Sequence, residues 1–527
     1  MNPNLAAFLE QQAAAHPERP AIIDRRGGKR RVASFRVLAD RVAAVAAGLA
    51  ARGVAPGDRV LLFVPMSLDL YVALLGVLHL GAQAVFVDAW AGRARIDAAI
   101  AAAAPRAWIA IPRAQLLRLQ SPAVRAIPIS ILAGGLWPLA RLERPAARRP
   151  AAVVDPASAA LVTFTTGSTG KPKAAARSHR FLWAQHRALA AHLALREDDI
   201  DMPTLPVFVL NNLALGVTSV IADFDPRRPA DIDPVSILAQ IREERVSTLV
   251  ASPAFCAKLV EHTLAAGGTL PLRRLFTGGA PVLPPLLRGL VATMSEGAEV
   301  LYGSTEAEPI SGIDIQAMLE AITPGGGAAP TTGLCVGAPV PEIALKIVRA
   351  DDGPIELDAS GWRPRELPVG ETGEIVVSGA HVLPGYLDDP EADRANKVRH
   401  GAQIWHRTGD AGYLDLDGRL WLMGRVKRRV RQAGVDWWPL PAELRAFTLP
   451  SVTHAAYLSL PGSERALLCI EGPPPEEHAN LENELRQRLA PWPLDQLIVL
   501  EAIPRDPRHH SKTDHDALIA LLTKVPR

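Results

Sequence analysis

Residues 161–179 read LVTFTTGSTGKPKAAARSH, and this stretch decides the fold. It begins as an apolar strand, continues into small hydroxyl residues and glycines, and then reaches two lysines, Lys171 and Lys173. Glycines let the backbone turn close to a ligand, and the hydroxyl and backbone N–H groups are donors for phosphate oxygens. The alternative is a polar surface loop, which the buried strand and the paired lysines disfavour. Since the pattern GxxxxGK[ST] is absent, we predict a phosphate-binding loop that is not a P-loop.

Alternating strand and helix patterns surround this loop. An apolar run at 59–64 follows Pro56-Gly57-Asp58, a helical pattern extends from about 68 to 80, and 84–87 is again apolar. Strand, helix and strand of these lengths are typical of a parallel βαβ unit. The same rhythm returns at 158–165, 247–251 and 274–276. We therefore predict an α/β fold with parallel sheets.

The second half of the chain has a different pattern. Residues 334–379 contain short β-type runs separated by Gly and Pro, and 413–423 predicts a hairpin with Asp417-Gly418 at its turn. We place a domain boundary at 424–427. The prediction is a large N-terminal domain, 1–424, that ends in a β-rich subdomain. A small C-terminal α+β domain, 425–527, follows it.

Composition excludes several classes of protein. The 527 residues include 57 Lys plus Arg against 55 Asp plus Glu, a balance that argues against a nucleic-acid partner. The three cysteines, Cys256, Cys335 and Cys469, lack the spacing of a disulfide scaffold or a zinc site. The N-terminus has no basic region of the signal-peptide type, and the longest apolar stretch, 71–87, is interrupted by polar residues and glycines. We expect no transmembrane segment and a cytoplasmic location.

Further motifs follow the phosphate loop in a fixed order. They are Gly278-Gly279-Ala280-Pro281, Tyr302-Gly303-Ser304-Thr305-Glu306, Thr408-Gly409-Asp410, Gly424-Arg425 and Ser511-Lys512-Thr513. Over about residues 5–520 the set resembles the AMP-forming adenylating superfamily, which includes acyl-CoA synthetases, peptide-synthetase adenylation domains and firefly luciferase. The resemblance implies an enzyme that uses ATP and Mg²⁺ to convert a carboxylic acid into an acyl-adenylate and pyrophosphate. It also implies that 1–424 holds the ATP and acyl sites and that 425–527 is a mobile domain carrying the catalytic lysine.

The resemblance also implies a role for each motif. The residues implied to bind phosphate are Thr165, Thr166, Gly167, Ser168, Thr169, Gly170 and Lys173. The residues implied to pack on adenine are Gly278, Gly279, Ala280 and Pro281. The next motif contributes to the nucleotide site through Tyr302, Gly303 and Ser304. Its Thr305 is implied to touch the phosphate, and its Glu306 to bind Mg²⁺. Asp410 binds both ribose hydroxyls, and Arg425 begins the hinge. Lys512 neutralises charge on the α-phosphate and carboxylate, so the implied catalytic residues are Lys512, Thr305 and Glu306.

The chemistry of single residues agrees with these roles but leaves alternatives open. A carboxylate such as Asp410 accepts hydrogen bonds from two vicinal hydroxyls, although Thr-Gly-Asp is also ordinary turn chemistry. One carboxylate plus substrate phosphates is the usual way to hold Mg²⁺, although Glu306 alone suits a helix start. Lys512 lies among polar residues that also suit an exposed tail. His509, His510 and His515 lack the spacing of a metal site.

An acyl pocket is expected from Trp183, Phe208, Asn211, Asn212, Gly216 and Ser252, together with Gly303. Its apolar bulk suggests a hydrophobic acid, and the two asparagines, if they point inward, would meet a hydroxyl. An Asp or Lys dedicated to an amino group is not evident, which disfavours an amino-acid substrate. The small-molecule partner is therefore a hydrophobic carboxylic acid.

Departures from the family pattern concern the acyl acceptor. Ala174 replaces the usual glycine, and 205–209 lacks the frequent histidine of the acyl-pocket motif. The loop 435–439, VDWWP, helps to shape the pantetheine tunnel in thioester-forming relatives, so an acid and two indoles there weigh against a thioester step. A narrower resemblance, carried by 213–234, by Trp405-His406-Arg407 and by Arg508-His509, is to the β-lactone synthetases of bacterial olefin biosynthesis.

Three functions therefore remain open. The first is an acyl-CoA ligase or acyl-carrier ligase, with CoA or an acyl-carrier protein as the acceptor. The second is a β-lactone synthetase, in which the hydroxyl of a 2-alkyl-3-hydroxy acid displaces AMP. The third, of another class, is a non-catalytic nucleotide-binding regulator, which the presence of both Glu306 and Lys512 disfavours.

Overall fold

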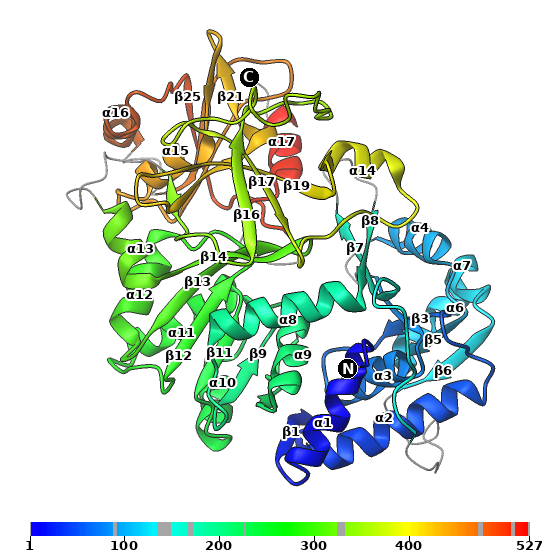
Figure 1. Cartoon of the computed structure of the whole chain (residues 1–527). Coiled ribbons are helices and arrows are strands. Elements are labelled where there is room, and N and C mark those ends of the chain that lie inside the picture. Colours follow the sequence, from blue (N-terminus) through cyan, green and yellow to red (C-terminus); the bar gives the residue numbers. More distant parts are fainter. Residues whose placement is uncertain are drawn as a thin grey trace.

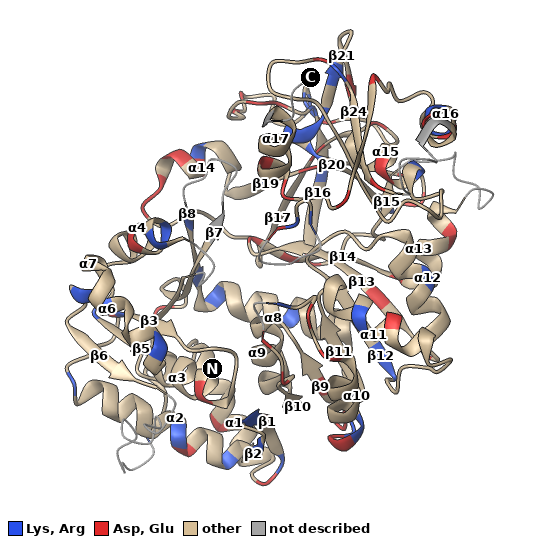
Figure 2. Cartoon of the chain, turned by 180° about the vertical axis from the view of Figure 1, so that it is seen from behind, with Lys and Arg blue, Asp and Glu red and all other residues tan. Residues whose placement is uncertain are grey.

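The structure is a computed structural model of the whole chain (Figure 1). It describes residues 2–87, 92–133, 149–166, 172–225, 228–323, 333–472, 478–506 and 512–524. Acidic and basic residues are interspersed along both halves of the molecule (Figure 2). Within the described ranges, no helix combines the length and the apolar character that a membrane crossing needs.

An eight-stranded sheet forms one half of the large domain. Its strand order is β14-β13-β12-β11-β9-β10-β1-β2, parallel throughout except for the pairs β13–β14 and β1–β2 at its two edges. The strands are β1 (Pro20–Arg26), β2 (Lys29–Ser34), β9 (Ile200–Pro203), β10 (Thr218–Val220), β11 (Thr248–Ala251), β12 (Arg274–Gly278), β13 (Ala298–Ser304) and β14 (Ala307–Asp314). Its outer helices are α10 (Pro234–Glu243), α11 (Pro253–Ala265), α12 (Pro284–Thr293) and α13 (Ile315–Ile322).

A six-stranded sheet with order β6-β5-β3-β4-β7-β8 forms the other half. Its strands are β3 (Arg59–Phe63), β4 (Gln83–Phe86), β5 (Ala107–Ala110), β6 (Ile129–Leu132), β7 (Ala159–Thr166) and β8 (Pro172–Ser178). The predicted βαβ unit is confirmed, because α3 (Leu68–His79) joins β3 to β4 and these strands pair in parallel. Short helices cover the outer face: α4 (Arg93–Ala103), α5 (Pro112–Gln115), α6 (Leu117–Gln120) and α7 (Pro122–Arg125).

Helices between the two sheets complete the large core. They are α1 (Phe8–Ala15), which follows η1 (Leu5–Ala7), α2 (Phe35–Ala50), α8 (His179–Leu193) and α9 (Pro206–Leu215). Ser178 caps α8 by accepting a hydrogen bond from the N–H of Phe181, so the helix begins directly after β8. Figure 1 shows α8 crossing the centre of the molecule between the two sheets.

The predicted β-rich subdomain has a six-stranded sheet, with the order β15-β20-β19-β17-β16 and with β18 paired to β19. They are β15 (Leu334–Cys335), β16 (Ile343–Val348), β17 (Gly373–Gly379), β18 (Lys397–His400), β19 (Gln403–Leu414) and β20 (Leu420–Arg425); α14 (Pro390–Asn396) precedes β18. The hairpin β19–β20 turns at Gly418, whose φ of +74° requires glycine-like freedom.

The C-terminal segment has an apolar core of its own and a three-stranded sheet, β23-β24-β25. Its elements are η3 (Val426–Arg428), β21 (Val430–Gln432), β22 (Val435–Trp437), α15 (Pro439–Ala446), β23 (His454–Leu458), β24 (Leu467–Glu471), α16 (His478–Leu489), β25 (Gln496–Leu500) and α17 (His515–Lys524). The expected boundary at 424–427 lies where β20 ends and η3 begins. All three cysteines are buried and free.

Candidate active site

Two motifs that are far apart in the sequence meet at Asp410. The hydroxyl of Tyr302 on β13 donates to Oδ2 of Asp410 on β19 at 2.8 Å, and Arg425 donates to Oδ1 at 3.0 Å. Burial and the neighbouring carboxylate raise the pKa of Tyr302, so the phenol keeps its proton. An ionised carboxylate has about four lone-pair sites. Asp410 therefore keeps acceptor capacity for ribose hydroxyls while its orientation is fixed.

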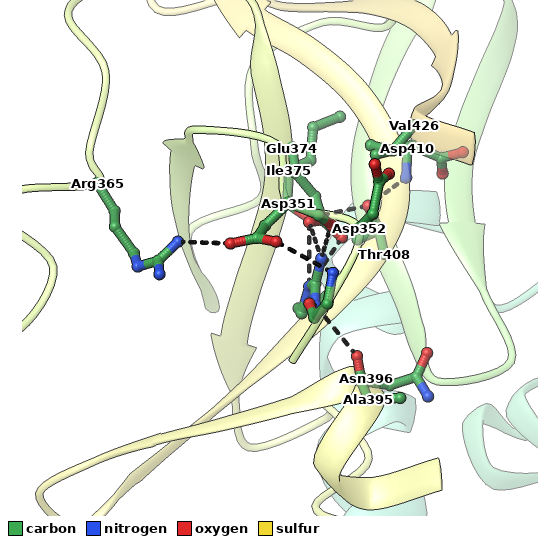
Figure 3. A network of polar contacts seen from close by, with 12 residues as sticks. Asp351, Asp352, Arg365, Glu374, Ile375, Ala395, Asn396, Thr408, Asp410 and Val426 are labelled. Carbon is green, nitrogen blue, oxygen red and sulfur yellow. Dashed lines mark hydrogen bonds and ion pairs between the residues drawn. The ribbon is translucent and has the colours of Figure 1, made fainter. Parts of the chain in front are cut away.

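A buried ion pair anchors the strand that carries Asp410 (Figure 3). Arg407 donates to Glu374 from Nε at 3.0 Å and from Nη2 at 2.6 Å, and it also donates to the backbone oxygen of Asp351 at 2.7 Å. Thr408 donates to the backbone oxygen of Ile375 at 2.9 Å. Since breaking a buried pair leaves an uncompensated charge, this network fixes β19 directly before Thr408-Gly409-Asp410, which continue the same strand and do not form the turn that such a segment often makes.

Glu306 is held by a segment of the β-rich subdomain. Its Oε1 accepts a hydrogen bond from the hydroxyl of Tyr386 at 3.0 Å, and its backbone oxygen accepts from the N–H of Leu383 at 2.7 Å. Lys173 Nζ lies 5.4 Å from the centre of the Tyr386 ring. Burial lowers the pKa of Lys173, and the charge of Glu306 opposes that effect. The expected Mg²⁺ ligand and the expected phosphate lysine are therefore neighbours.

Lys397 is a member of this cluster that no motif indicates. Its Nζ lies 5.3 Å from the centre of the same Tyr386 ring, donates to the backbone oxygen of Leu383 and lies 3.2 Å from His406 Nδ1. Burial lowers the pKa of Lys397 to about 7. Burial and the charge of Lys397 lower the pKa of His406 well below its usual value. The sequence pointed to this cluster only through His406, which belongs to the Trp-His-Arg segment. Lys397 lies on the neighbouring strand β18, and its contact with His406 depends on the pairing of β18 with β19.

The carboxyl ends of β12 and β13 form a tight edge. Gly278 pairs with Leu301, and a Cβ on Gly278 would lie 2.3 Å from the Leu301 backbone oxygen. Gly279 has a φ of +82°, and a Cβ on Gly303 would lie 2.9 Å from the Ala307 backbone oxygen. Ligands of open α/β sheets bind at this edge of the strands. The expected adenine segment and the Tyr-Gly-Ser-Thr-Glu segment thus lie side by side.

The phosphate loop itself, Gly167–Lys171, lies outside the described residues, as does Ser511. Its flanks are placed: Thr165 pairs with Lys173 and Thr166 with Pro172 in the antiparallel β7–β8 pair. The backbone oxygen of Lys512 accepts from Asp506 N at 2.7 Å, and the hydroxyl of Thr513 lies 3.0 Å from His454 Nε2.

The expected acyl-pocket residues divide into two groups. Phe208 on α9 packs with Leu189 of α8, and Asn211 Oδ1 lies 2.9 Å from His186 Nδ1 of α8. The other four residues have structural contacts. Trp183 donates a hydrogen bond to the Pro3 backbone oxygen, and Asn212 donates to Asp201 at 2.7 Å. Gly216 ends α9 next to Gln12, and Ser252 caps the N-terminus of α11. Among the described residues, Phe208 and Asn211 therefore contact α8 from α9, and the other four residues take part in neighbouring structural contacts.

A model of the family described as "AMP-binding enzyme" matches residues 9–387. The chain belongs to this family. Two relatives named olefin β-lactone synthetase are similar over nearly the full length. The protein of Stenotrophomonas maltophilia is 32% identical, covering 98% of this chain and 97% of the relative. That of Xanthomonas campestris is 33% identical, covering 98% and 96%.

More distant relatives broaden the comparison. The long-chain-fatty-acid–CoA ligase FadD13 of Mycobacterium tuberculosis is 26% identical, covering 96% of both chains. The ATP-bound structure of MatB from Rhodopseudomonas palustris superposes with a TM-score of 0.83 over all of both chains, at 22% identity, and shows the fold. This AMP-binding enzyme therefore uses ATP and forms acyl-adenylates, as the sequence predicts, and the alternative of a non-catalytic regulator is not supported.

Gln185 is a buried residue of this AMP-binding enzyme that the sequence analysis did not select. It lies on α8, is 1% exposed, and has no hydrogen-bond partner for either carboxamide atom among the described residues. Most buried polar side-chain atoms are hydrogen-bonded, so such a group needs an explanation. A glutamine within a helical stretch of mostly apolar residues was the signal available in the sequence.

Proposed function

We propose that this enzyme is a β-lactone synthetase: it adenylates a hydrophobic 3-hydroxy acid with MgATP, and the substrate's own hydroxyl then displaces AMP. The observation that carries the proposal is the full-length similarity to two olefin β-lactone synthetases, at 32% and 33% identity, against 26% for the CoA ligase.

In the first step a carboxylate oxygen of the acid attacks the α-phosphorus of ATP, and pyrophosphate leaves with the electron pair of the broken P–O bond. Glu306, held by Tyr386, suits Mg²⁺, because that ion usually takes one or two carboxylates plus phosphate oxygens. In this proposal Asp410, held by Tyr302, binds the ribose hydroxyls, and the edge at Gly278 packs on adenine. Lys173, next to Tyr386, binds the outer phosphates. Lys512 supplies the charge at the α-phosphate. Positioning and electrostatic stabilisation are the main sources of such catalysis.

In the second step the 3-oxygen of the acyl-adenylate bonds to the carboxyl carbon, and the bond from that carbon to the phosphate oxygen breaks. AMP leaves with the electron pair, and the hydroxyl proton is released. The attack is intramolecular, so it avoids the entropic cost of binding a separate acceptor, an advantage of up to about 7–11 kcal/mol in well-oriented systems. That advantage offsets part of the strain of the four-membered ring.

The contacts of the loop after Gly434 support an acceptor other than a thiol. Asp436 forms ion pairs with Arg429 at 3.0 Å and with Arg431 at 2.9 Å. Trp437 packs edge-on against Trp492, and Trp438 is buried. Asp436 and Trp437 are thus engaged within the C-terminal segment, whereas Trp438 packs against Ala411 and Met423 of the β-rich subdomain. A loop committed to such contacts is less suited to lining a pantetheine tunnel.

The competing function is an acyl-CoA or acyl-carrier ligase, favoured by the similarity to FadD13. The experiment is incubation of the protein and MgATP with a panel of 3-hydroxy and unsubstituted fatty acids, with and without CoA, followed by mass spectrometry. The proposal expects a product lighter than the hydroxy acid by one water, formed without CoA. An acyl-CoA as the main product would establish the ligase. A cytoplasmic location and a mobile small domain stay predictions.

A further inference from the structure

Two buried glutamines of this protein differ in how their carboxamides are satisfied. Gln240 on α10 is 3% exposed; its Oε1 accepts from the N–H of Asp223 and its Nε2 donates to the Ile221 backbone oxygen, both at 3.0 Å. Gln185 on α8 is more deeply buried, and both of its carboxamide atoms lack a partner within the described residues. A buried amide without hydrogen bonds costs free energy, so a ligand that satisfies it gains affinity.

The helix periodicity shows which way Gln185 faces. Residues three and four apart share one face of a helix, so Gln185 lies in line with Leu182 and Leu189. Leu182 packs in the large apolar core of the N-terminal half. Leu189 packs with Phe208 in a separate apolar cluster. Gln185 therefore lies on the buried face of α8, in line with the Leu189–Phe208 cluster of the expected acyl pocket, along the helix that crosses the centre of Figure 1.

A second amide close by is only half satisfied. Asn211 on α9 is 2% exposed, and its Oδ1 lies 2.9 Å from Nδ1 of His186, the residue that follows Gln185. Its Nδ2 has no partner among the described residues. If the amide were turned over, the oxygen would be the atom left without a partner, so one free amide atom remains in either orientation. The α8–α9 contact thus holds unused hydrogen-bonding capacity in an otherwise apolar region.

We propose that the Gln185 carboxamide recognises the 3-hydroxyl of the acid, with Asn211 as a secondary contributor; this inference rests on the proposed function. A carboxamide offers one acceptor and two donors, and a hydroxyl offers one donor and two acceptor lone pairs, so each satisfies the other. Gln185 is a specificity and positioning residue here and takes no part in proton transfer. Holding the hydroxyl on one side of the acyl chain also restricts the directions from which its oxygen reaches the carboxyl carbon.

Discrimination against acids without the hydroxyl follows from the same contact. An unsubstituted acid of equal length would fill the pocket and leave the carboxamide unpaired and shielded from water. Sites built to hydrogen-bond a substrate hydroxyl reject analogues that lack it far more strongly than apolar pockets reject an extra methylene. The enzyme should therefore prefer the 3-hydroxy acid already at the adenylation step.

The test measures ATP–pyrophosphate exchange with a 3-hydroxy fatty acid and with the unsubstituted acid of the same chain length. In Gln185→Met, kcat/KM for the hydroxy acid should fall by roughly 5- to 150-fold, while that for the unsubstituted acid stays constant or rises. Tm should not fall, because no internal hydrogen bond is lost. Gln240→Met is the matched control: it should lower Tm and leave the ratio of the two kcat/KM values unchanged.

Two results would overturn the inference: a wild-type enzyme without preference for the hydroxy acid, or an unchanged ratio in Gln185→Met. Either would mean that water satisfies this amide. If the methionine variant does not fold, Gln185→Asn, which withdraws the amide by one methylene, should lower the preference for the hydroxy acid instead. Preference for the hydroxy acid combined with a CoA thioester as the product would refute the proposed function and leave this inference standing.

Discussion

The hydroxyl of Tyr302 donates to Oδ2 of Asp410 at 2.8 Å, a bond between residues 108 positions apart in the chain. It joins β13 of the eight-stranded sheet to β19 of the β-rich subdomain. This bond therefore fixes the expected ribose-binding carboxylate relative to the strand edge that is expected to bind adenine. Preorganisation of this kind reduces the ordering cost of binding.

Asp410→Ala should weaken ATP and AMP binding, because the two ribose hydroxyls lose a charged acceptor. Hydrogen bonds to charged groups contribute about 1.5–3 kcal/mol each, less what water restores. Tyr302→Phe should weaken binding by a smaller amount, since it removes the orienting bond and leaves the acceptor in place. Calorimetric titration with ATP and AMP measures both affinities, and an unchanged affinity in Asp410→Ala would restrict Asp410 to its structural contacts with Tyr302 and Arg425.

Lys512→Ala should reduce adenylation by about 10²–10³ while ATP affinity stays near that of the wild type. One preorganised charge at the transition state is typically worth that factor. Lys258→Ala is the control, because the Lys258 side chain is partly exposed on α11 and pairs with the neighbouring Glu261. Pyrophosphate exchange at the wild-type rate in Lys512→Ala would remove this lysine from the mechanism.

Tyr386→Phe should raise the Mg²⁺ concentration needed for half-maximal adenylation, because Glu306 loses its 3.0 Å hydrogen bond. A rise of about fivefold to tenfold corresponds to one ordinary hydrogen bond. The phenylalanine ring keeps the contacts with Lys173 and Lys397. Tyr457→Phe, which loses a bond to the Pro493 backbone oxygen in the C-terminal segment, should leave the Mg²⁺ dependence unchanged.

Glu443→Gln should flatten the dependence of stability on pH between about 4.5 and 7. Burial raises the pKa of Glu443 to about 7, although the N–H of Tyr457 donates to its carboxylate. The folded protein therefore holds this proton at pH values where the unfolded chain has lost it, so wild-type stability falls as pH rises from about 4.5 to 7. The glutamine has no proton to lose. Thermal unfolding across this range measures the difference, and Glu320→Gln at an exposed position is the control; parallel wild-type and Glu443→Gln curves would contradict the prediction.

Local patterns were sufficient to predict the α/β class, the βαβ unit and the hairpin at Gly418, because each depends on residues close together in the chain. The motifs that meet at Asp410 and Glu306 were also visible, since they are contiguous. Lys397 and Tyr386 were not found, because their importance depends on contacts with His406 and Glu306 that only the tertiary structure creates.

The acyl-pocket predictions also separate into features that local sequence determines and contacts that depend on tertiary packing. Asn212 was expected to face the substrate, but its amide donates to Asp201, a buried residue outside every motif. Its direction depends on how α9 packs, which periodicity alone does not determine. Gly216 carries a local signal of another kind, since a glycine after a helix commonly ends it in the left-handed conformation, and its φ is +77°.

The most direct test of the central claim counts AMP molecules released per enzyme molecule in the absence of any thiol. With a 3-hydroxy acid and MgATP, the account predicts continuous AMP release over many turnovers, because the hydroxyl regenerates the free enzyme. With the unsubstituted acid it predicts almost no AMP release, because the acyl-AMP stays bound and the bond between its carboxyl carbon and the phosphate oxygen is not broken. Continuous release that requires CoA, and that proceeds as fast with the unsubstituted acid, would contradict the account.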